Sequence, residues 1–520
     1  MKNLILLTFF ILTTFAFAGE PLLSDPIPYP YYEVQRAEDG NKNYLTILNS
    51  GLGSFEKRLE MIRNAKESVE LEYFIYEKGL SGKLLMQELV KAGKRGVKVR
   101  ILIDKSLAVI ELNEFHAQEL SPYNIEIRFY NAAPLIQLST IQFRNHRKVM
   151  IADGKYAIVG GRNIGDDYFD MSLKYNFLDR DVYIDGPIVK TIEDSFNEYF
   201  NHKISERPQF PRAKHLKRIA KLTKKSKEKK LKRKNKLIKR IDKIKAKYNK
   251  KIEAVQEFIN RDNTFEVKLQ KISALGRKIL EKTKSHLCPE TTWSSDRPGG
   301  TWWVRLKDKY SDDYRYLRKT IADKVMETDK ALYLSSPYLM NNGKSRTIMY
   351  KLLERGVKIT AYTNSLSSTD ATYVAANLYK DVYVWRKRGI VTHAHHGDFI
   401  SEEDVIDERV KKARWGTHSK TYLFETSRHN EFMISTYNID NRSNHYNTEL
   451  GLFCKGSPEL YSDVKDNMLS RINHGMEILK GRKARDNQTG ELVNRFGRHR
   501  AGLTQMRLLS LPSWLLKFLL

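Results

Sequence analysis

Two distant segments of the chain share one arrangement of reactive side chains. His146 and Lys148 (FRNHRKVMIAD) in the first, and His418 and Lys420 (GTHSKTYLFE) in the second, are each separated by one residue. One imidazole can attack a phosphodiester while a second protonates the leaving oxygen, and ammonium groups can stabilise the charge on the phosphate. The two segments together therefore predict metal-free phosphoryl transfer at one shared site.

Further polar residues accompany each segment at matching places. An acid lies seven residues after each histidine, Asp153 and Glu425, and an asparagine follows further on, Asn163 and Asn438. A third His-x-Lys sequence begins at His215, but it lacks the following acid, so we interpret it as a chance match.

The two halves also repeat in the elements expected to position these residues. Each half has an apolar strand-like run, a helix-like stretch and a turn of sequence Arg-Gly-Val. The first half contains these at 69–76, 84–94 and 95–97, and the second at 331–339, 347–354 and 355–357. The turn glycines are 260 residues apart and the motif histidines 272, which indicates duplication. We expect an α/β fold of two similar α/β/α sandwich lobes, related by a pseudo-twofold that brings His146 and His418 face to face.

The length and composition agree with two lobes. A chain of 520 residues with 41% hydrophobic content can bury two domain-sized cores. We divide it into a signal peptide (1–18), a lead segment (19–44), a first lobe (45–205), a basic helical insertion (206–300), a second lobe (301–475) and a basic or apolar tail (476–520).

The first residues predict export. A basic start, the apolar run 4–15 and a small-residue pattern ending at Ala18 are typical of a cleaved signal peptide, with an uncleaved anchor as the alternative. We expect a periplasmic or secreted protein that is peripherally associated with membranes. The cysteines, Cys288 and Cys454, could be bridged in such a compartment or remain buried thiols, and both states stay open.

Most of the net charge of +29 lies in one tract. Between Arg212 and Lys251 there are 21 lysines and arginines but two acids. Apolar residues recur there and just beyond at helical steps, namely at Ile241, Ile244, Tyr248, Ile252, Val255 and Ile259. This pattern predicts a long amphipathic helix or helical hairpin. It is either a solvated insertion or a dock for an anionic surface, and the apolar end 508–520 either lies in a membrane surface or packs on the second lobe.

One cluster of histidines resembles a set of metal ligands. His393, His395 and His396 are crowded, but a loop of histidines without a second ligand cluster is more often exposed to solvent or lines a substrate site. We therefore expect no metal and no other cofactor.

The duplicated His-x-Lys-x4-acid signature resembles that of the phospholipase D superfamily, over about 45–205 and 310–475. Several further stretches are similar to those of bacterial cardiolipin synthase-like members that lack amino-terminal membrane spans. These are Gly160-Gly-Arg-Asn163-Ile-Gly165, Asp167-Tyr-Phe169, Ser335-Ser-Pro-Tyr338, Asn364-Ser-Leu-Ser-Ser-Thr-Asp370, Asn438-Ile-Asp440-Asn-Arg442-Ser443 and Asn447-Thr-Glu449.

The resemblance implies a role for each residue of the signature. His146 would attack phosphorus to form a phosphohistidine, and His418 would act as general acid and then as base. The motif lysines and the two asparagines, Asn163 and Asn438, would hold the phosphoryl oxygens, while Asp153 and Glu425 would support the motifs. Family members usually have Asp where this chain has Glu425, so we expect a looser second half.

An acid about thirty residues after each motif would hold the imidazole ring in place. The matching positions are Asp181 and Glu449, although the neighbouring Asp179 leaves the first assignment open.

The function implied is that of an exported phosphodiesterase or phosphatidyltransferase acting on phospholipid in anionic membranes. An exported nuclease with the same chemistry and a non-catalytic protein that binds anionic surfaces are the alternatives.

Overall fold

The computed structural model describes residues 26–106, 111–132, 143–227, 229–260, 263–299, 315–339, 343–371, 382, 384–400, 405–479 and 483–493. The expected signal peptide (1–18) and the apolar end 508–520 lie outside these residues.

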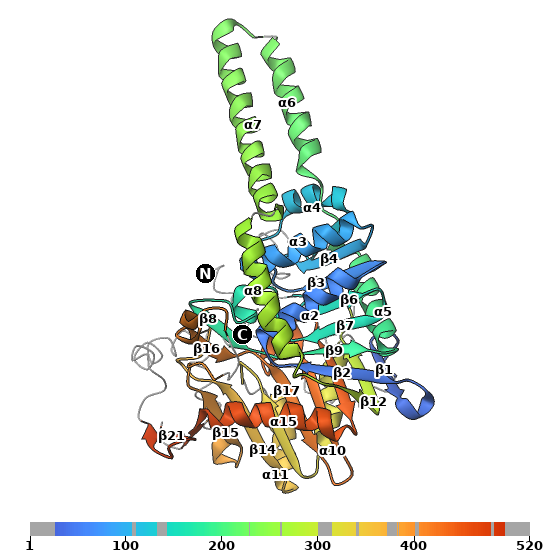
Figure 1. Ribbon diagram of the computed structural model, residues 1–520, viewed down its shortest axis with the longest axis vertical. Helices are drawn as coiled ribbons and strands as arrows, with labels where there is room; N and C mark the ends of the chain where they lie inside the picture. The colour runs from blue at the N-terminus through green and yellow to red at the C-terminus, as the bar shows by residue number, and fades with distance from the viewer. Residues whose placement is uncertain are drawn as a thin grey trace, which may run out of the picture.

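The first lobe is built on a nine-stranded sheet (Figure 1). Its strand order is β10 (Ser205–Glu206), β5 (Ile125–Tyr130), β4 (Lys98–Asp104), β3 (Ser68–Tyr73), β6 (Val149–Ala152), β7 (Tyr156–Gly160), β9 (Asp181–Asp185), β2 (Asn43–Leu48) and β11 (Ser285–Cys288). Strands β3, β4 and β5 pair in parallel, whereas β6 runs antiparallel to β3. Apolar side chains such as Val69, Ile101 and Val149 are fully buried in these central strands, as expected for a sheet covered on both faces.

The second lobe has an eleven-stranded sheet with a matching centre. Its order is β1 (Tyr32–Arg36), β12 (Glu290–Ser295), β19 (Leu450–Lys455), β18 (Asn430–Ser435), β17 (Lys420–Glu425), β13 (Ala331–Ser335), β14 (Lys358–Asn364), β15 (Val391–His395), β20 (Gly475–Ile478), β21 (Ala484–Asp486) and β22 (Leu492–Val493). Read from β15 to β12, it repeats the first sheet read from β5 to β2. The predicted fold class, two similar α/β lobes, is confirmed.

The Arg-Gly-Val turns perform the same task in both lobes. Each ends a helix, α3 (Leu80–Lys94) or α11 (Gly343–Glu354), and leads into the next parallel strand. The turn glycines have left-handed backbones, with φ of 98° at Gly96 and 82° at Gly356. A side chain is disfavoured in this conformation, which explains why both halves have glycine there.

Helices cover both sheets and join them. The outer helices are α2 (Gly51–Asn64), α3, α4 (Glu114–Leu120) and α8 (Asn263–Leu280) on the first lobe, and α10 (Tyr316–Glu327) and α11 on the second. Helix α5 (Ile188–Asn201) contacts β12 of the second sheet, and α15 (Pro458–Asn473) contacts β2 of the first. Both helices contribute to one apolar cluster that includes side chains from both sheets. The lobes therefore share a core and do not pack as separate domains.

The chain crosses between the sheets twice. The predicted bounds of the lead segment, the insertion and the tail are therefore wrong, because each of these segments contributes strands to the second sheet. Strand β1, within the lead segment, and β12, within the insertion, both belong to the second sheet, and β20 to β22 extend that sheet into the tail. The reason is that each sheet pairs an otherwise open edge with a strand from outside its own repeat. A disulfide between Cys288 of β11 and Cys454 of β19 links the two sheets.

The basic tract forms a helical hairpin, one of the two predicted forms, made of α6 (Pro211–Lys227) and α7 (Leu231–Ile259). The hairpin projects from the first lobe (Figure 1). Val255 and Ile259 at its base are buried against that lobe. The chance motif residue His215 lies in the hairpin, where its ring stacks on Tyr248 with centroids 3.9 Å apart. Among the described residues no helix combines the length and hydropathy needed to cross a membrane.

Candidate active site

The two motifs lie at equivalent strand ends and meet across the lobe junction. Lys148 directly precedes β6, and Lys420 is the first residue of β17. The backbone N–H of His146 donates to the carbonyl of Thr448 in the second lobe, at 3.0 Å, and that of His418 donates to the carbonyl of Leu178 in the first, at 2.9 Å. A short parallel pair, β8 (Tyr175–Leu178) with β16 (Arg414–Thr417), strengthens the junction beside His418. Both motif backbones are therefore fixed by the opposite lobe.

The ring of His146 is oriented by an acid of the second lobe. Its Nδ1 lies 2.9 Å from Oε2 of Glu449 and 3.1 Å from the carbonyl of Thr436. Because both neighbours accept hydrogen bonds, Nδ1 carries the proton and Nε2 keeps a lone pair. Burial, together with Lys148 and Lys420, holds the pKa of His146 well below its usual value. A neutral imidazole with a free Nε2 is suited to nucleophilic attack.

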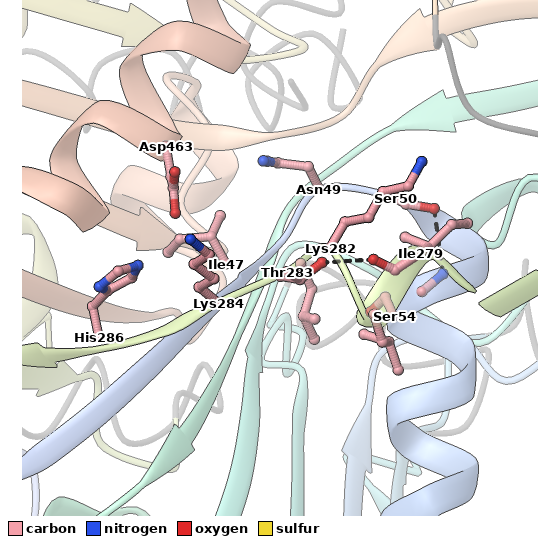
Figure 2. Close-up of a pocket in the computed structure, with 13 residues that line it drawn as sticks. Ile47, Asn49, Ser50, Ser54, Ile279, Lys282, Thr283, Lys284, His286 and Asp463 are labelled. Atoms are coloured by element: carbon pink, nitrogen blue, oxygen red, sulfur yellow. Dashed lines mark hydrogen bonds between the residues drawn. The ribbon is translucent and has the colours of Figure 1, made fainter. Parts of the chain in front are cut away.

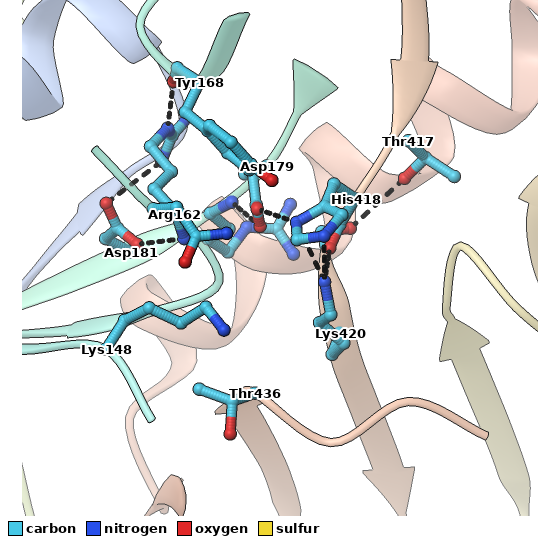
Figure 3. Close-up of polar contacts among 12 residues, drawn as sticks. Lys148, Arg162, Tyr168, Asp179, Asp181, Thr417, His418, Lys420 and Thr436 are labelled. Atoms are coloured by element: carbon cyan, nitrogen blue, oxygen red, sulfur yellow. Dashed lines mark hydrogen bonds and ion pairs between the residues drawn. The ribbon is translucent and has the colours of Figure 1, made fainter. Parts of the chain in front are cut away.

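His418 is oriented in the same way by an acid of the first lobe. Its Nδ1 lies 2.6 Å from Oδ2 of Asp179 (Figure 3). Burial alone would raise the pKa of Asp179, but His418, Lys420 and Arg162 outweigh it and hold that pKa well below its usual range. Burial and Lys420 lower the pKa of His418 to about 4, whereas Asp179 opposes this shift. His418 thus has an ionised partner that can stabilise an imidazolium.

The sequence left the first orienting acid open between Asp181 and Asp179, and in the structure Asp179, not Asp181, bonds to a motif histidine. The Asp181 carboxylate accepts hydrogen bonds from Arg58 at 3.0 Å and from Ser54 at 2.7 Å, both on α2, and lies beside Arg162 in Figure 3. The physical reason is position: Asp181 begins β9 and its carboxylate meets α2, while Asp179 precedes the strand at the lobe junction.

The glycine pair before Arg162 makes room for both acids. A Cβ atom added at Gly160 would lie 2.2 Å from Oδ1 of Asp181, and one at Gly161 would lie 2.2 Å from Oδ1 of Asp179. Both positions must therefore be glycine, because the two carboxylates lie too close for any side chain. The glycine pair could have indicated the position of both acids from the sequence.

Both motif lysines are buried beside their histidines. Lys148 Nζ donates to the carbonyl of His146 at 2.7 Å. Lys420 Nζ donates to the carbonyl of His418 at 2.5 Å and lies 3.0 Å from its Nε2. Burial lowers the pKa of Lys148 well below its usual value and that of Lys420 to about 8. A bound phosphate would favour the charged form of both amines.

The two asparagines have different surroundings. Asn163 Oδ1 accepts the backbone N–H of Ile75 at 3.2 Å, and its side chain also bonds to Tyr168, whose ring lies 5.3 Å from that of His418. Asn438 Oδ1 is buried without a hydrogen-bond partner among the described residues. Asn438 therefore keeps a free polar group.

The motif-supporting acids are not equivalent. Asp153 accepts hydrogen bonds from three consecutive backbone N–H groups, those of residues 66–68, and so anchors the start of β3. Glu425 instead accepts from Tyr461 at 2.9 Å and from Lys465 at 2.5 Å. In the second lobe the acid and the backbone donor exchange places. Asp329, just before β13, accepts the backbone N–H of Ser427 in the turn between β17 and β18. Replacement of aspartate by glutamate is thus compensated by an acid on the neighbouring segment.

One supporting acid escaped the sequence analysis. Asp296 follows β12 and accepts the backbone N–H groups of Glu449 at 2.9 Å and Leu317 at 3.1 Å. Burial raises its pKa to about 7. It fixes the backbone of the acid that orients His146, and no repeat or motif marks it in the sequence.

A cavity of about 400 Å³ lies elsewhere at the junction (Figure 2). It is lined by the start of α2, by residues 279–286 around the end of α8, and by Asp463 of α15. None of the motif residues lines it. Asn49, which lines the cavity, connects it to the candidate active site. Its side-chain oxygen accepts a hydrogen bond at 2.6 Å from Arg180, the residue after Asp179.

The histidine cluster is built differently from the expectation of an exposed or substrate-lining loop. His395 is fully buried at the end of β15, His393 bonds to Asn487 at 3.0 Å, and His396 pairs with Asp486 at 2.9 Å. Within the described residues no group of three or more potential ligands is arranged to hold a metal ion.

Comparisons with known proteins agree with the predicted family and with the fold. Residues 59–200 match the family model described as "Cardiolipin synthase, PLD-like domain". This segment is similar to a phospholipase D-like domain. The predicted resemblance to the phospholipase D superfamily is confirmed, and the second lobe repeats the strand order of this domain.

Relatives extend the phospholipase D-like similarity along most of the chain. An "Uncharacterized protein" of Helicobacter pylori (strain ATCC 700392 / 26695) is 29% identical over 82% of this chain and 81% of its own length. Cardiolipin synthase C of Escherichia coli (strain K12) is 24% identical over 78% and 80%, respectively. The crystal structure of phosphatidylserine synthase from Haemophilus influenzae Rd KW20 superposes with a TM-score of 0.57 and 14% identity, covering 94% of this chain and 97% of that one. At this identity the structural match demonstrates a common fold.

Proposed function

We propose that the protein is an exported phosphatidyltransferase or phosphodiesterase that acts on phospholipid through a covalent phosphohistidine. One observation carries the proposal: each motif histidine bonds through Nδ1 to an acid of the opposite lobe, so that neither acid occupies Nε2. The Nε2 of His418 lies 3.0 Å from Lys420 Nζ, beside an amine that can bind the phosphoryl oxygens. The cardiolipin synthase family match and the relatives named cardiolipin synthase support phospholipid as the substrate class.

In the first step the Nε2 lone pair of His146 attacks phosphorus, and the bond from phosphorus to the head-group oxygen breaks. His418, as imidazolium, gives its Nε2 proton to the leaving alkoxide, which departs as an alcohol. Lys148 and Lys420 stabilise the charge on the non-bridging oxygens. The product is a phosphatidyl group on His146.

In the second step the neutral His418 accepts a proton from an incoming alcohol or water, whose oxygen attacks phosphorus. The phosphorus–nitrogen bond breaks and His146 is regenerated. His418 must be protonated when substrate is bound, although its pKa in the free protein is about 4. A phosphodiester anion beside the ring favours the imidazolium, so substrate binding is expected to be coupled to proton uptake.

Matched histidine variants test the chemistry. Purified protein is incubated with phosphatidylglycerol vesicles and, separately, with DNA and RNA. We expect new cardiolipin or phosphatidic acid without nucleotide release, loss of this product in His146→Ala, and full turnover in His215→Ala, which alters the chance motif. Nucleotide release without lipid turnover would indicate the nuclease alternative, and turnover by His146→Ala would remove the nucleophile from the proposal.

Export is supported by two independent features. The leader pattern at residues 1–18 is joined by the disulfide between the sheets, a bond that persists mainly in oxidising compartments. Cell fractionation followed by mass spectrometry of the amino terminus should find the chain outside the cytoplasm, beginning at Gly19. A cytoplasmic chain that retains Met1 would contradict export.

The projecting hairpin is proposed to dock on an anionic membrane. The segment 212–251 carries 21 basic and two acidic residues, and most of its lysines are exposed. Each Lys or Arg near an anionic surface contributes about 1 kcal/mol of binding free energy. Leu231, at the start of α7, is 73% exposed and adds an apolar side chain close to the turn.

A docking test can distinguish the contribution of the lysine charges from that of the helical structure. We expect binding to phosphatidylglycerol vesicles, but not to phosphatidylcholine vesicles, to be lost when the lysines around the turn are changed to glutamine. These are Lys224, Lys225, Lys227, Lys229, Lys230 and Lys232. Helix content and turnover of a soluble short-chain lipid should stay unchanged. Unaltered vesicle binding, or binding to DNA alone, would refute membrane docking.

A further inference from the structure

Three buried polar groups of the second lobe have no role in the proposed chemistry. They are the hydroxyl of Tyr362 on β14, Nε2 of His395 on β15 and Nη1 of Arg471 on α15. Tyr362 and His395 are 0% exposed and Arg471 is 5% exposed. None of these three atoms has a hydrogen-bond partner among the described residues.

The fold directs all three side chains to one place. Strands β14 and β15 are neighbours in parallel register, with Asn364 opposite His395, so Tyr362 and His395 lie on the same sheet face. Their rings form an edge contact with centroids 6.5 Å apart. Helix α15, which carries Arg471, packs against β15, and its Met468 and Ile472 share an apolar cluster with Tyr362. The charge of Arg471 acts to lower the pKa of both Tyr362 and His395.

The hydrogen bonding of His395 makes its free nitrogen a donor. Its Nδ1 accepts the backbone N–H of Gly397 at 2.8 Å. The proton of the neutral ring must then be on Nε2, the atom without a partner. Arg471 Nη1 can only donate, and Tyr362 can donate its hydroxyl proton. The cluster thus presents three donors, and unsatisfied buried donors are costly.

Charge around the cluster is also unbalanced. Arg180 and Arg471 are buried, and neither forms an ion pair with a carboxylate of the described residues. Arg180 is held by neutral groups, including Thr421 at 3.0 Å and Asn467 at 2.7 Å. Asp179 attracts both guanidinium groups, but its carboxylate is bonded to His418. Asp170 also attracts Arg471, but its carboxylate accepts the backbone N–H of Gly51. A buried cation without a partner is strongly unfavourable.

We propose that Tyr362, His395 and Arg471 form a binding site for a small inorganic monoanion of about chloride size. A water molecule accepts at most two hydrogen bonds and brings no charge, so it would leave one donor or the guanidinium charge uncompensated. A monoanion accepts from all three donors and neutralises one guanidinium.

The anion would stabilise the candidate active site indirectly, through Arg471 and the backbone of Asp179. Arg471 Nη2 donates to the carbonyl of Asp179 at 3.2 Å, and Asp179 orients His418. A filled site therefore fixes the arginine that holds the backbone of this acid. This role does not depend on the identity of the substrate.

Two measurements test the site on the intact protein. In crystals grown with sodium bromide, an anomalous peak is expected within hydrogen-bond distance of Tyr362 Oη, His395 Nε2 and Arg471 Nη1. In thermal unfolding, sodium chloride should raise the Tm saturably, whereas sodium gluconate at equal ionic strength should not, because gluconate is too large for a buried site.

A matched pair of variants links the stabilisation to the cluster. Tyr362→Phe removes one donor and should shift the chloride midpoint about tenfold higher, as expected for one hydrogen bond to a charged group. Tyr333→Phe, on the neighbouring strand, should leave it unchanged. Equal effects of chloride and gluconate on the wild type, or water in place of bromide in the crystal, would overturn the proposal even if Tyr362→Phe failed to fold.

Discussion

At each motif histidine, the acid bound to Nδ1 determines which protonation state the ring can support. Two aspartates only two residues apart have different tasks: Asp179 bonds to His418, while Asp181 pairs with Arg58 inside the first lobe. An imidazole can lose its proton when its acid is removed, whereas an arginine remains charged. Variants at the two positions should therefore fail in different ways.

Asp179→Asn is expected to lower kcat about 10⁴-fold with modest loss of stability, as for another histidine deprived of its orienting acid. Asp181→Asn should instead cost about 3–5 kcal/mol of unfolding free energy, because it leaves Arg58 buried and unpaired. Turnover assays and urea unfolding of both variants provide the measurement. A stable but inactive Asp181→Asn protein would contradict this assignment and indicate that Asp181 acts in the active site.

The buried amine of Lys420 predicts the alkaline limb of the pH profile. Burial lowers its pKa to about 8, so the amine is charged below that pH and becomes neutral above it. Phosphate stabilisation needs the charge, and kcat/KM should therefore fall as the pH rises through about 8. Lys420→Arg, which stays charged, should move this limb upward, while Lys455→Arg on the surface should not. An unmoved limb in Lys420→Arg would assign it to another group.

At the scale of elements, the turn between β6 and β7 depends on Asp153. Three backbone N–H groups of residues 66–68 donate to this carboxylate, which holds its pKa below the usual value despite partial burial. A depressed pKa means that the stabilisation is present at neutral pH and is lost as the pH falls through the folded-state value.

Asp153→Ala is expected to reduce the unfolding free energy by about 1–2 kcal/mol, a range discounted for solvent exposure. Glu425→Ala should cost less, because Asp329 already holds the equivalent turn of the second lobe. Denaturant unfolding at pH 7 and pH 3 measures both effects. Equal losses in the two variants would show that the two acids act alike.

At the scale of the whole molecule, the lobes are joined by exchanged strands, a shared apolar core and one disulfide. The bridge closes a loop of 166 residues between Cys288 and Cys454. In the chain-entropy description, a loop of this length stabilises the folded state by about 5 kcal/mol.

Reduction should therefore lower the midpoint of denaturant unfolding, and the double variant Cys288→Ser/Cys454→Ser should match the reduced wild type in the presence or absence of reductant. If oxidised and reduced wild-type protein unfolded at the same denaturant concentration, the bridge would have no part in holding the lobes together.

Much of this protein follows from its sequence. The repeated signature around His146 and His418 predicts the chemistry, and the repeated Arg-Gly-Val turns predict the two lobes. Both rest on local rules: a residue type has its own reactivity, and a turn needs a left-handed glycine. The helices of the basic tract follow equally from helical periodicity, whereas their pairing in a hairpin came from the structure.

The tertiary structure alone decided which acid meets which imidazole, where the crossing strands pair, and that His395 is buried. Glu449 reaches His146, and Asp179 reaches His418, because the acids come from opposite lobes. Side chains separated by 303 and 239 residues meet only through packing, and a hydrogen bond depends on distances of a few tenths of an ångström. Residue spacing along a chain carries no such information across two lobes.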